Sequence, residues 1–115
     1  MPHFVIDCSS DVLKLQNPTE VLQSVHAVAV ATNLFDEADI KVRLNPFAEH
    51  YLVGGKQEPF IHVFANIMEG RTKEQKANLS EQITRKLSRF FPEISFIAIN
   101  IRDFEKETYC NKSMI

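Results

Sequence analysis

The chain opens with a short apolar run, Met1-Pro2-His3-Phe4-Val5-Ile6-Asp7-Cys8, and a second proline-led run, Pro59-Phe60-Ile61-His62-Val63-Phe64-Ala65-Asn66-Ile67, opens its second half. Both runs are rich in β-branched and aromatic residues, a composition that predicts strands over residues 3–8 and 60–67. Ser9-Ser10-Asp11 ends the first of them. The two runs therefore predict two related halves, each beginning with a strand.

A polar connection and then a helix are expected after the first strand. Asn17 suits the N-cap position, Pro18 the first helical position and Glu20 the third, where a carboxylate also interacts favourably with the helix dipole. We expect the helix to end near Asn33. Its apolar positions recur at steps of three and four, as in an amphipathic helix: Val21, Leu22, Val25, Val28 and Ala29.

A second helix is expected after the second run. Gly70-Arg71 forms the connection, and Thr72 with Gln75 three residues later is the signature of a capping box. Pro92 is expected to end this helix because proline cannot continue one. The residues expected on its core face are Leu79, Ile83, Leu87 and Phe90 or Phe91.

Each helix is expected to lead into a further strand. Apolar and polar residues alternate over residues 40–47, as they do in a strand with one covered face. Residues 96–104 are apolar at most positions, which predicts a strand with neighbours on both sides of the sheet. Between the halves, Tyr51-Leu52-Val53-Gly54-Gly55 is typical of a small strand and a turn.

The order strand, helix, strand occurs twice, which predicts an α/β fold built from two tandem βαβ units. We expect a four-stranded mixed sheet with both helices on one face, because each unit crosses over right-handedly. The 115 residues fit a single domain, residues 1–115, with an internal repeat at about 2–58 and 59–115. The helices leave one sheet face bare, so we expect other copies to cover it in a homo-oligomer.

Composition narrows the classes of function. Apolar residues make up 44% and charged residues 24% of the chain, as in ordinary globular proteins. The net charge of -2 is unlike the strongly basic character of proteins that bind nucleic acid or anionic membranes. No apolar stretch reaches the ~18 residues of a membrane span, and no signal peptide is recognised. These features favour a cytoplasmic protein.

Metal and thiol chemistry are not indicated by the sequence. Cys8 and Cys110 lie far apart, and we expect both to be reduced, with a disulfide between them as the alternative. His3 and His62 both fall on expected strands and could approach one another. A hydrogen-bonded pair is favoured over a metal site, because no third ligand follows at a suitable spacing.

Pro2 is the residue that could acquire the most unusual reactive group. Trimming of Met1 would leave its ring nitrogen as a free secondary amine, whereas the nitrogen of Pro59 is always an amide. Arg43 lies in the middle of an expected strand, where an unpaired charge is expensive if buried. Arg71 lies in the connection before the second helix, where α/β proteins commonly bind ligands.

The run Met1-Pro2-His3-Phe4-Val5-Ile6-Asp7-Cys8-Ser9 resembles the opening of the 5-carboxymethyl-2-hydroxymuconate isomerases, in the tautomerase superfamily. From Pro59 through Glu69-Gly70-Arg71-Thr72-Lys73-Glu74-Gln75-Lys76, the second half is similar to a 4-oxalocrotonate tautomerase subunit. The resemblance covers nearly the whole chain and is weak over residues 46–58 and after Phe104. It implies a tautomerase fold, like that of macrophage migration inhibitory factor, and assembly as a homotrimer.

The resemblance also implies an activity that needs no cofactor. Pro2 would be the catalytic general base of an isomerase that moves a proton in an unsaturated 2-hydroxymuconate-type dicarboxylate, as in the catabolism of aromatic compounds. Arg43 and Arg71 would bind the substrate carboxylates, and Phe4 and Phe104 would wall the pocket. Apolar surroundings and nearby arginines would lower the pKa of the amine towards ambient pH, where a base works best.

Several other interpretations stay open at this point. A retained Met1 would leave Pro2 as an amide that cannot act as a base. Arg43 could be a solvated edge residue or part of an ion pair, and Arg71 a surface residue before a helix cap. The alternative functions are a hydratase or dehalogenase that uses the same proline, and a non-catalytic trimeric binding or scaffold protein.

Overall fold

The computed structural model describes all 115 residues, and its four strands form one mixed sheet in the order β2-β1-β3-β4. The strands are β1 (His3–Ser9), β2 (Lys41–Phe47), β3 (Phe60–Met68) and β4 (Phe96–Phe104). β1 runs parallel to β2, β3 runs parallel to β4, and β1 is antiparallel to β3. The predicted fold class is therefore confirmed, and the division into halves at residues 2–58 and 59–115 stays a prediction.

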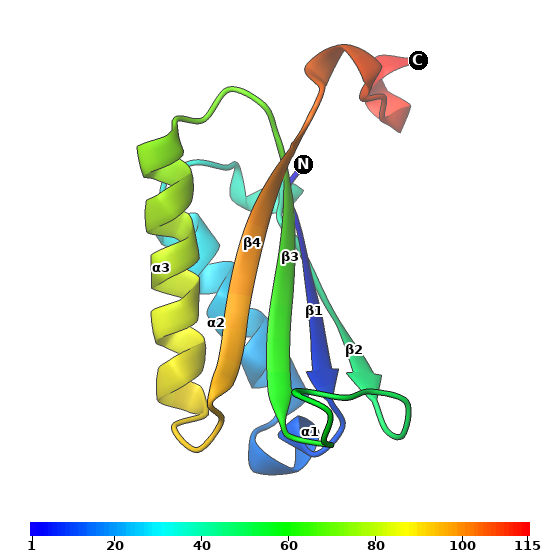
Figure 1. Cartoon of the computed structure of the whole chain (residues 1–115). Coiled ribbons are helices and arrows are strands. Elements are labelled where there is room, and N and C mark those ends of the chain that lie inside the picture. Colours follow the sequence, from blue (N-terminus) through cyan, green and yellow to red (C-terminus); the bar gives the residue numbers. More distant parts are fainter.

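The long helices α2 (Pro18–Ala31) and α3 (Lys73–Phe90) pack side by side on the same face of the sheet (Figure 1). The expected polar connection after β1 contains a short helix, α1 (Val12–Leu15). Three single 3-10 turns complete the structure: Glu37–Asp39, Lys106–Thr108 and Lys112–Met114. No helix has both the length and the apolar character needed to span a bilayer.

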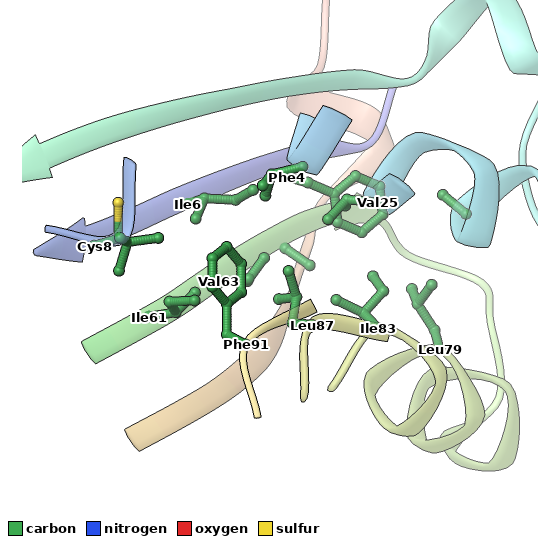
Figure 2. Packing of buried hydrophobic residues seen from close by; sticks show 14 of the residues in the cluster. Phe4, Ile6, Cys8, Val25, Ile61, Val63, Leu79, Ile83, Leu87 and Phe91 are labelled. Carbon is green, nitrogen blue, oxygen red and sulfur yellow. The ribbon is translucent and has the colours of Figure 1, made fainter. Parts of the chain in front are cut away.

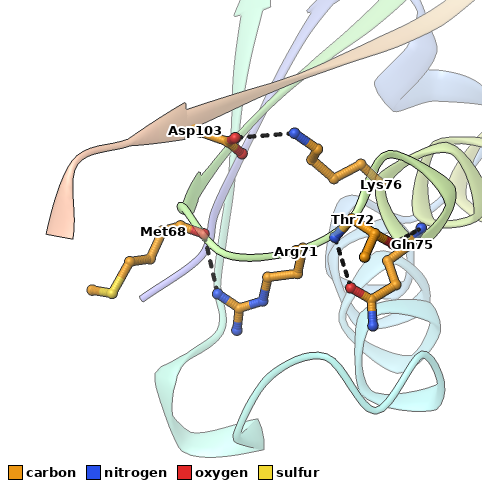
Figure 3. Close-up of polar contacts among 6 residues, drawn as sticks. All are labelled: Met68, Arg71, Thr72, Gln75, Lys76 and Asp103. Atoms are coloured by element: carbon orange, nitrogen blue, oxygen red, sulfur yellow. Dashed lines mark hydrogen bonds and ion pairs between the residues drawn. The ribbon is translucent and has the colours of Figure 1, made fainter.

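Both predicted helix starts are confirmed. The side chain of Asn17 accepts hydrogen bonds from the backbone nitrogens of Thr19, at 2.8 Å, and Glu20, at 3.4 Å. At α3, the Thr72 hydroxyl accepts from the Gln75 nitrogen at 3.1 Å, and the Gln75 side chain accepts from the Thr72 nitrogen at 2.9 Å (Figure 3). These caps satisfy backbone N–H groups that a helix start leaves without partners.

The core lies between the sheet and the two long helices (Figure 2). Alternate residues of β1 and β3 point into it, because successive strand side chains face opposite sides. Leu79, Ile83 and Leu87 of α3 meet them with no exposed surface, as the helix periodicity predicted. Each buried side chain of this size contributes about 1.5–3 kcal/mol of transfer free energy. The inward residues of the two strands are Phe4, Ile6, Cys8, Ile61, Val63, Ala65 and Ile67.

The expectation that residues 96–104 have neighbours on both sides is wrong. β4 is an edge strand that pairs only with β3, and neither long helix packs on the opposite face of the sheet (Figure 1). Phe96 is 50% exposed and Phe64 39% exposed on that face. Apolar composition alone did not distinguish a strand covered by its own chain from one whose outer face is bare. We call this face the open face of the sheet.

The segment after β4 continues beyond the end of the strand and projects from the body of the molecule (Figure 1). The ring of Tyr109 stacks on Phe104, with centroids 5.4 Å apart and planes inclined at 29°. The Glu69 carboxylate accepts a hydrogen bond from the Lys106 nitrogen at 2.7 Å. The tail is thereby attached beside the open face, where it contributes to a pocket.

Candidate functional site

A pocket of about 270 Å³ lies where the chain enters β1, and we call it the Pro2 pocket. It brings Pro2 and Arg71 together, although they come from opposite halves of the sequence. Most of its other walls come from the segment between α2 and β2. The lining residues are Met1, Pro2, Asn33, Leu34, Phe35, Asp36, Asp39, Met68 and Arg71.

Pro2 is buried and its backbone is held firmly. Its carbonyl accepts a hydrogen bond from the Lys41 nitrogen at 3.0 Å, and the Met1 amine donates to the Asp39 carbonyl at 2.8 Å. With Met1 in place the Pro2 nitrogen is an amide. It has no basicity in this form of the chain.

The surroundings disfavour a charged amine at this chain end. Burial lowers the pKa of the Met1 amino group, and the positive charges of Lys41 and Arg71 lower it further, against the opposing effect of Asp39. A low-dielectric environment penalises the charged form, and nearby cations add to that penalty. An amine located here is therefore biased towards its neutral, proton-accepting state.

Arg71 is fixed in the Pro2 pocket by backbone groups. It follows Gly70, whose φ of 120° lies in a region that favours glycine. Its Nη1 donates to the Met68 carbonyl at 3.1 Å (Figure 3), and its Nη2 donates to the Leu34 carbonyl at 2.6 Å. The guanidinium also lies 5.0 Å from the centroid of the Phe35 ring. Arginine has five N–H donors, so donors remain for a ligand.

Arg43 lies in a different pocket, of about 310 Å³, on the open face. We call it the Arg43 pocket. Its lining residues are His3, Arg43, Asn66, Phe104 and Tyr109. Strand side chains alternate between faces, so residues 3 and 43 share the open face while Pro2 points to the other side. A single chain therefore does not bring Arg43 to the Pro2 pocket.

The prediction that Phe4 and Phe104 line the substrate pocket is partly wrong. Phe4 has no exposed surface and packs edge-on against Phe35, at 6.1 Å between centroids, inside the core. Phe104 does line a pocket, but it is the Arg43 pocket, where Tyr109 stacks on it. Sequence reasoning missed Phe35 and Tyr109, because both lie in irregular segments whose positions depend on tertiary packing.

The predicted approach of the two strand histidines is also wrong. His3 lies opposite Asn66 in the sheet, and His62 lies opposite Asp7. No group of three or more histidine, cysteine or acidic side chains is arranged to hold a metal ion. Neither histidine therefore belongs to a candidate metal centre.

The largest cavity, of about 830 Å³, lies away from both candidate sites. It is an open groove along α3 and the edge strand β4, lined mainly by small and polar side chains. The ion pair of Arg85 with Glu81, at 2.7 Å, lies along it. None of the residues predicted to act on a substrate lines this groove.

Comparisons with known proteins identify a family and a shared fold. A family model described as 5-carboxymethyl-2-hydroxymuconate isomerase matches residues 2–113. Comparison with curated protein sequences finds no match. The structure is similar to that of a 5-carboxymethyl-2-hydroxymuconate isomerase from Deinococcus radiodurans R1, with a TM-score of 0.82 and 21% sequence identity over 96% of this chain and 88% of that chain.

Two further solved structures have the same fold. Pt0534 inactivated by 2-oxo-3-pentynoate gives a TM-score of 0.80 at 20% identity, over 96% of this chain and 91% of that chain. A fused 4-OT wild-type symmetric trimer gives a TM-score of 0.80 at 18% identity, also over 96% of this chain and 91% of that chain. These likenesses establish the fold of the sheet and helices around the two pockets.

Proposed function

The chain belongs to the 5-carboxymethyl-2-hydroxymuconate isomerase family, and from this premise we propose that it is a cofactor-independent isomerase whose general base is the Pro2 nitrogen after removal of Met1. The observation that carries the proposal is the shared pocket of Pro2 and Arg71. A proton acceptor and a fixed cation side by side suit an anionic substrate that must lose and regain a proton.

The proposed reaction moves one proton and shifts double bonds. The neutral Pro2 amine removes the hydroxyl proton of an unsaturated 2-hydroxymuconate-type dicarboxylate. The electron pair of the O–H bond forms the carbonyl, the conjugated double bonds move along the chain, and a distant carbon accepts the proton from the Pro2 ammonium. Substrate and product have the same formula, so no oxidant, reductant or cofactor is consumed.

The local environment supports the required pKa. The Met1 amine lies one residue before the Pro2 nitrogen, and there burial and the cations of Lys41 and Arg71 lower its pKa. Pro2 is buried as well. A general base is most effective when its pKa lies near the working pH, so this lowering favours catalysis near neutrality.

Arg71 is the proposed partner for the carboxylate and enolate next to the base. Its guanidinium is held by the Met68 and Leu34 carbonyls, so little ordering is needed when a ligand binds. A preorganised donor next to the place where negative charge develops lowers the barrier of the step.

Arg43 is the proposed partner for the second carboxylate, reached through assembly. Its pocket lies on the open face, which includes the half-exposed Phe64 and Phe96 and is not covered by either long helix (Figure 1). We propose a homotrimer in which a neighbouring copy covers this face and brings its Pro2 pocket against the Arg43 pocket. Apolar surface of this kind is typical of contacts between subunits.

The test starts with protein whose free Pro2 amino terminus has been verified by mass spectrometry. An ultraviolet assay would follow conversion of 5-carboxymethyl-2-hydroxymuconate, with 2-hydroxymuconate as a second substrate. We expect Pro2→Ala to lower kcat/KM by about 10²–10⁴-fold, the usual contribution of a general base. Insertion of a lysine between Met1 and Pro2 keeps the terminus blocked and should abolish turnover with the fold intact. Unchanged turnover in either variant would exclude Pro2 as the base.

A further inference from the structure

We infer that His3 is a positioning residue for substrate binding: its Nδ1 accepts a hydrogen bond from the Arg43 Nη1 at 3.0 Å and aims the guanidinium into the Arg43 pocket. The inference rests on the proposed function, because it assigns Arg43 to a substrate carboxylate. The side chain of Arg43 forms no ion pair and no other hydrogen bond within the chain. His3 is therefore its one polar anchor.

The chemistry of the two groups fixes the protonation state of the imidazole. A guanidinium has donors and no acceptor, so Nδ1 must offer a lone pair and the ring proton must be on Nε2. A protonated ring would present two N–H donors and a positive charge to Arg43. The contact would then become repulsive, and the guanidinium would lose its anchor.

The groups around His3 keep the ring neutral. The groups that surround the His3 ring are Lys41 and Arg43 of β2, the amino terminus, the uncharged Asn66 of β3 and Tyr109 of the tail. Burial, followed by the positive charges of Arg43 and Lys41, lowers the pKa of His3 below its ordinary value. The acceptor on Nδ1 is thus present at neutral pH and lost as the solution becomes acidic.

An anchored arginine binds a carboxylate better than a free one. Arg43 is exposed, and an exposed arginine has many rotamers that must be lost when it binds a ligand. The bond to His3 restricts these rotamers in advance and leaves the other guanidinium donors for two parallel bonds to a carboxylate. The stacked rings of Phe104 and Tyr109 wall the same pocket.

The decisive variants are His3→Leu and His3→Asn, both made with the free Pro2 terminus verified. Leucine removes the acceptor, whereas the amide oxygen of asparagine replaces Nδ1 without being able to titrate. We expect His3→Leu to raise KM for the dicarboxylate about tenfold with little change in kcat, a shift typical of lost preorganisation. His3→Asn should recover most of that loss. His50→Leu, which changes an exposed histidine outside both pockets, should leave KM unchanged.

The pH profile provides a readout that a purely structural role would not change. In the wild type, KM should rise as the solution is acidified below the ordinary histidine pKa of 6.5, because His3, whose pKa is lowered, then gains a proton. In His3→Asn this rise in KM should disappear. Any pH dependence of kcat that comes from titration of the Pro2 amine should remain. Persistence of the rise in His3→Asn, or a KM for His3→Leu equal to that of the wild type, would overturn the inference.

Direct binding separates this inference from the proposed reaction. The affinity of cis,cis-muconate, a dicarboxylate without the reactive hydroxyl, would be measured by calorimetry for the same variants. If turnover is absent, the reaction is rejected, yet an approximately tenfold weaker binding by His3→Leu would still support the role of His3. No detectable binding by the wild type, or equal binding by wild type and His3→Leu, would reject it.

Discussion

Pro2 and His3 are adjacent in the sequence, yet Pro2 lines the pocket of Arg71 whereas His3 lines the pocket of Arg43. The cause is the alternation of side chains along β1, which sends successive residues to opposite sides of the sheet. The start of one strand thus contributes to two pockets that do not face one another within a chain. For the proposed reaction, this separation makes assembly a requirement of the complete site.

The first prediction concerns the two carbonyls that hold Arg71. Arg71→Lys keeps the charge, but its single nitrogen cannot replace two nitrogens that donate to Met68 and Leu34. We expect a loss of about 1–2 kcal/mol in the free energy of unfolding, as for lost hydrogen bonds, measured by urea denaturation. We also expect kcat/KM to fall at least about tenfold, because a misplaced guanidinium stabilises the enolate less well.

Arg85→Lys is the matched control for that substitution. Arg85 forms an exposed ion pair with Glu81 on α3, and such pairs contribute about 0–1 kcal/mol. The control should leave kcat/KM unchanged. Equal effects of the two substitutions would show that Arg71 is an ordinary surface arginine.

The second prediction concerns Gly70, which precedes Arg71 with a φ of 120°. No atom lies within 4 Å of an added Cβ, so the penalty of Gly70→Ala comes from backbone strain alone. We expect destabilisation of about 1–3 kcal/mol and a raised KM, because relief of the strain would move Arg71. Gly54→Ala, at a φ of 57° in a distant turn, should also destabilise but leave KM unchanged. A normal KM for Gly70→Ala would contradict this coupling.

The third prediction concerns the cap of α3. Thr72→Ala removes the hydroxyl that accepts from the Gln75 nitrogen and should destabilise the fold by about 1 kcal/mol. Thr84→Ala, within the body of the same helix, should change stability by about 0.5 kcal/mol or less. Urea denaturation of both variants checks the difference, and similar free energies of unfolding would exclude an energetic role for the capping box.

The fourth prediction concerns the open face of the sheet. Phe64→Glu places a charge where we propose that a neighbouring copy binds, at a side chain that is 39% exposed in the single chain. Sedimentation equilibrium should show a shift from trimer to monomer with an unchanged far-ultraviolet circular dichroism spectrum, and turnover should be lost. Leu52→Glu changes a residue that is 71% exposed in a loop, and it should stay trimeric. An active Phe64→Glu monomer would rule out a site shared between copies.

The fifth prediction concerns the two free thiols. Burial raises the pKa of the Cys8 thiol to about 11, whereas Cys110 is exposed. In Cys110→Ser, the remaining thiol should resist modification at pH 8 until urea unfolds the chain, because the thiolate is the reactive form. Cys8→Ala should leave a thiol that reacts at once. Rapid reaction of native Cys110→Ser would show that Cys8 is accessible.

The same shift sets the direction of a pH effect on stability. The unfolded thiol ionises near its ordinary pKa of 9.0, while the folded one keeps its proton to higher pH. The folded chain therefore binds more protons than the unfolded chain between these values, and stability falls as pH rises above about 9. Cys8→Ala should reduce this fall in urea midpoints measured between pH 8 and 10.

Local chemistry explains why much of the fold could be predicted from sequence. The cap at Asn17 and the box formed by Thr72 and Gln75 involve residues within one turn of each other, so their signals are complete in the sequence. The core face of α3 follows likewise from helical periodicity. The expectation that the strand over residues 96–104 has neighbours on both sides was wrong because apolar composition does not distinguish burial within a chain from burial against another copy.

The candidate site was predictable as a set of residues and only partly as an arrangement. The sequence by itself determined the helix starts, the strand alternation and a proline able to become a terminal amine, since these depend on residue type and short spacing. Only the tertiary structure decided that Arg71 joins Pro2 while Arg43 joins His3 on the opposite face. The physical reason is that strand order and register place residues from distant segments together, and both depend on packing across the whole sheet.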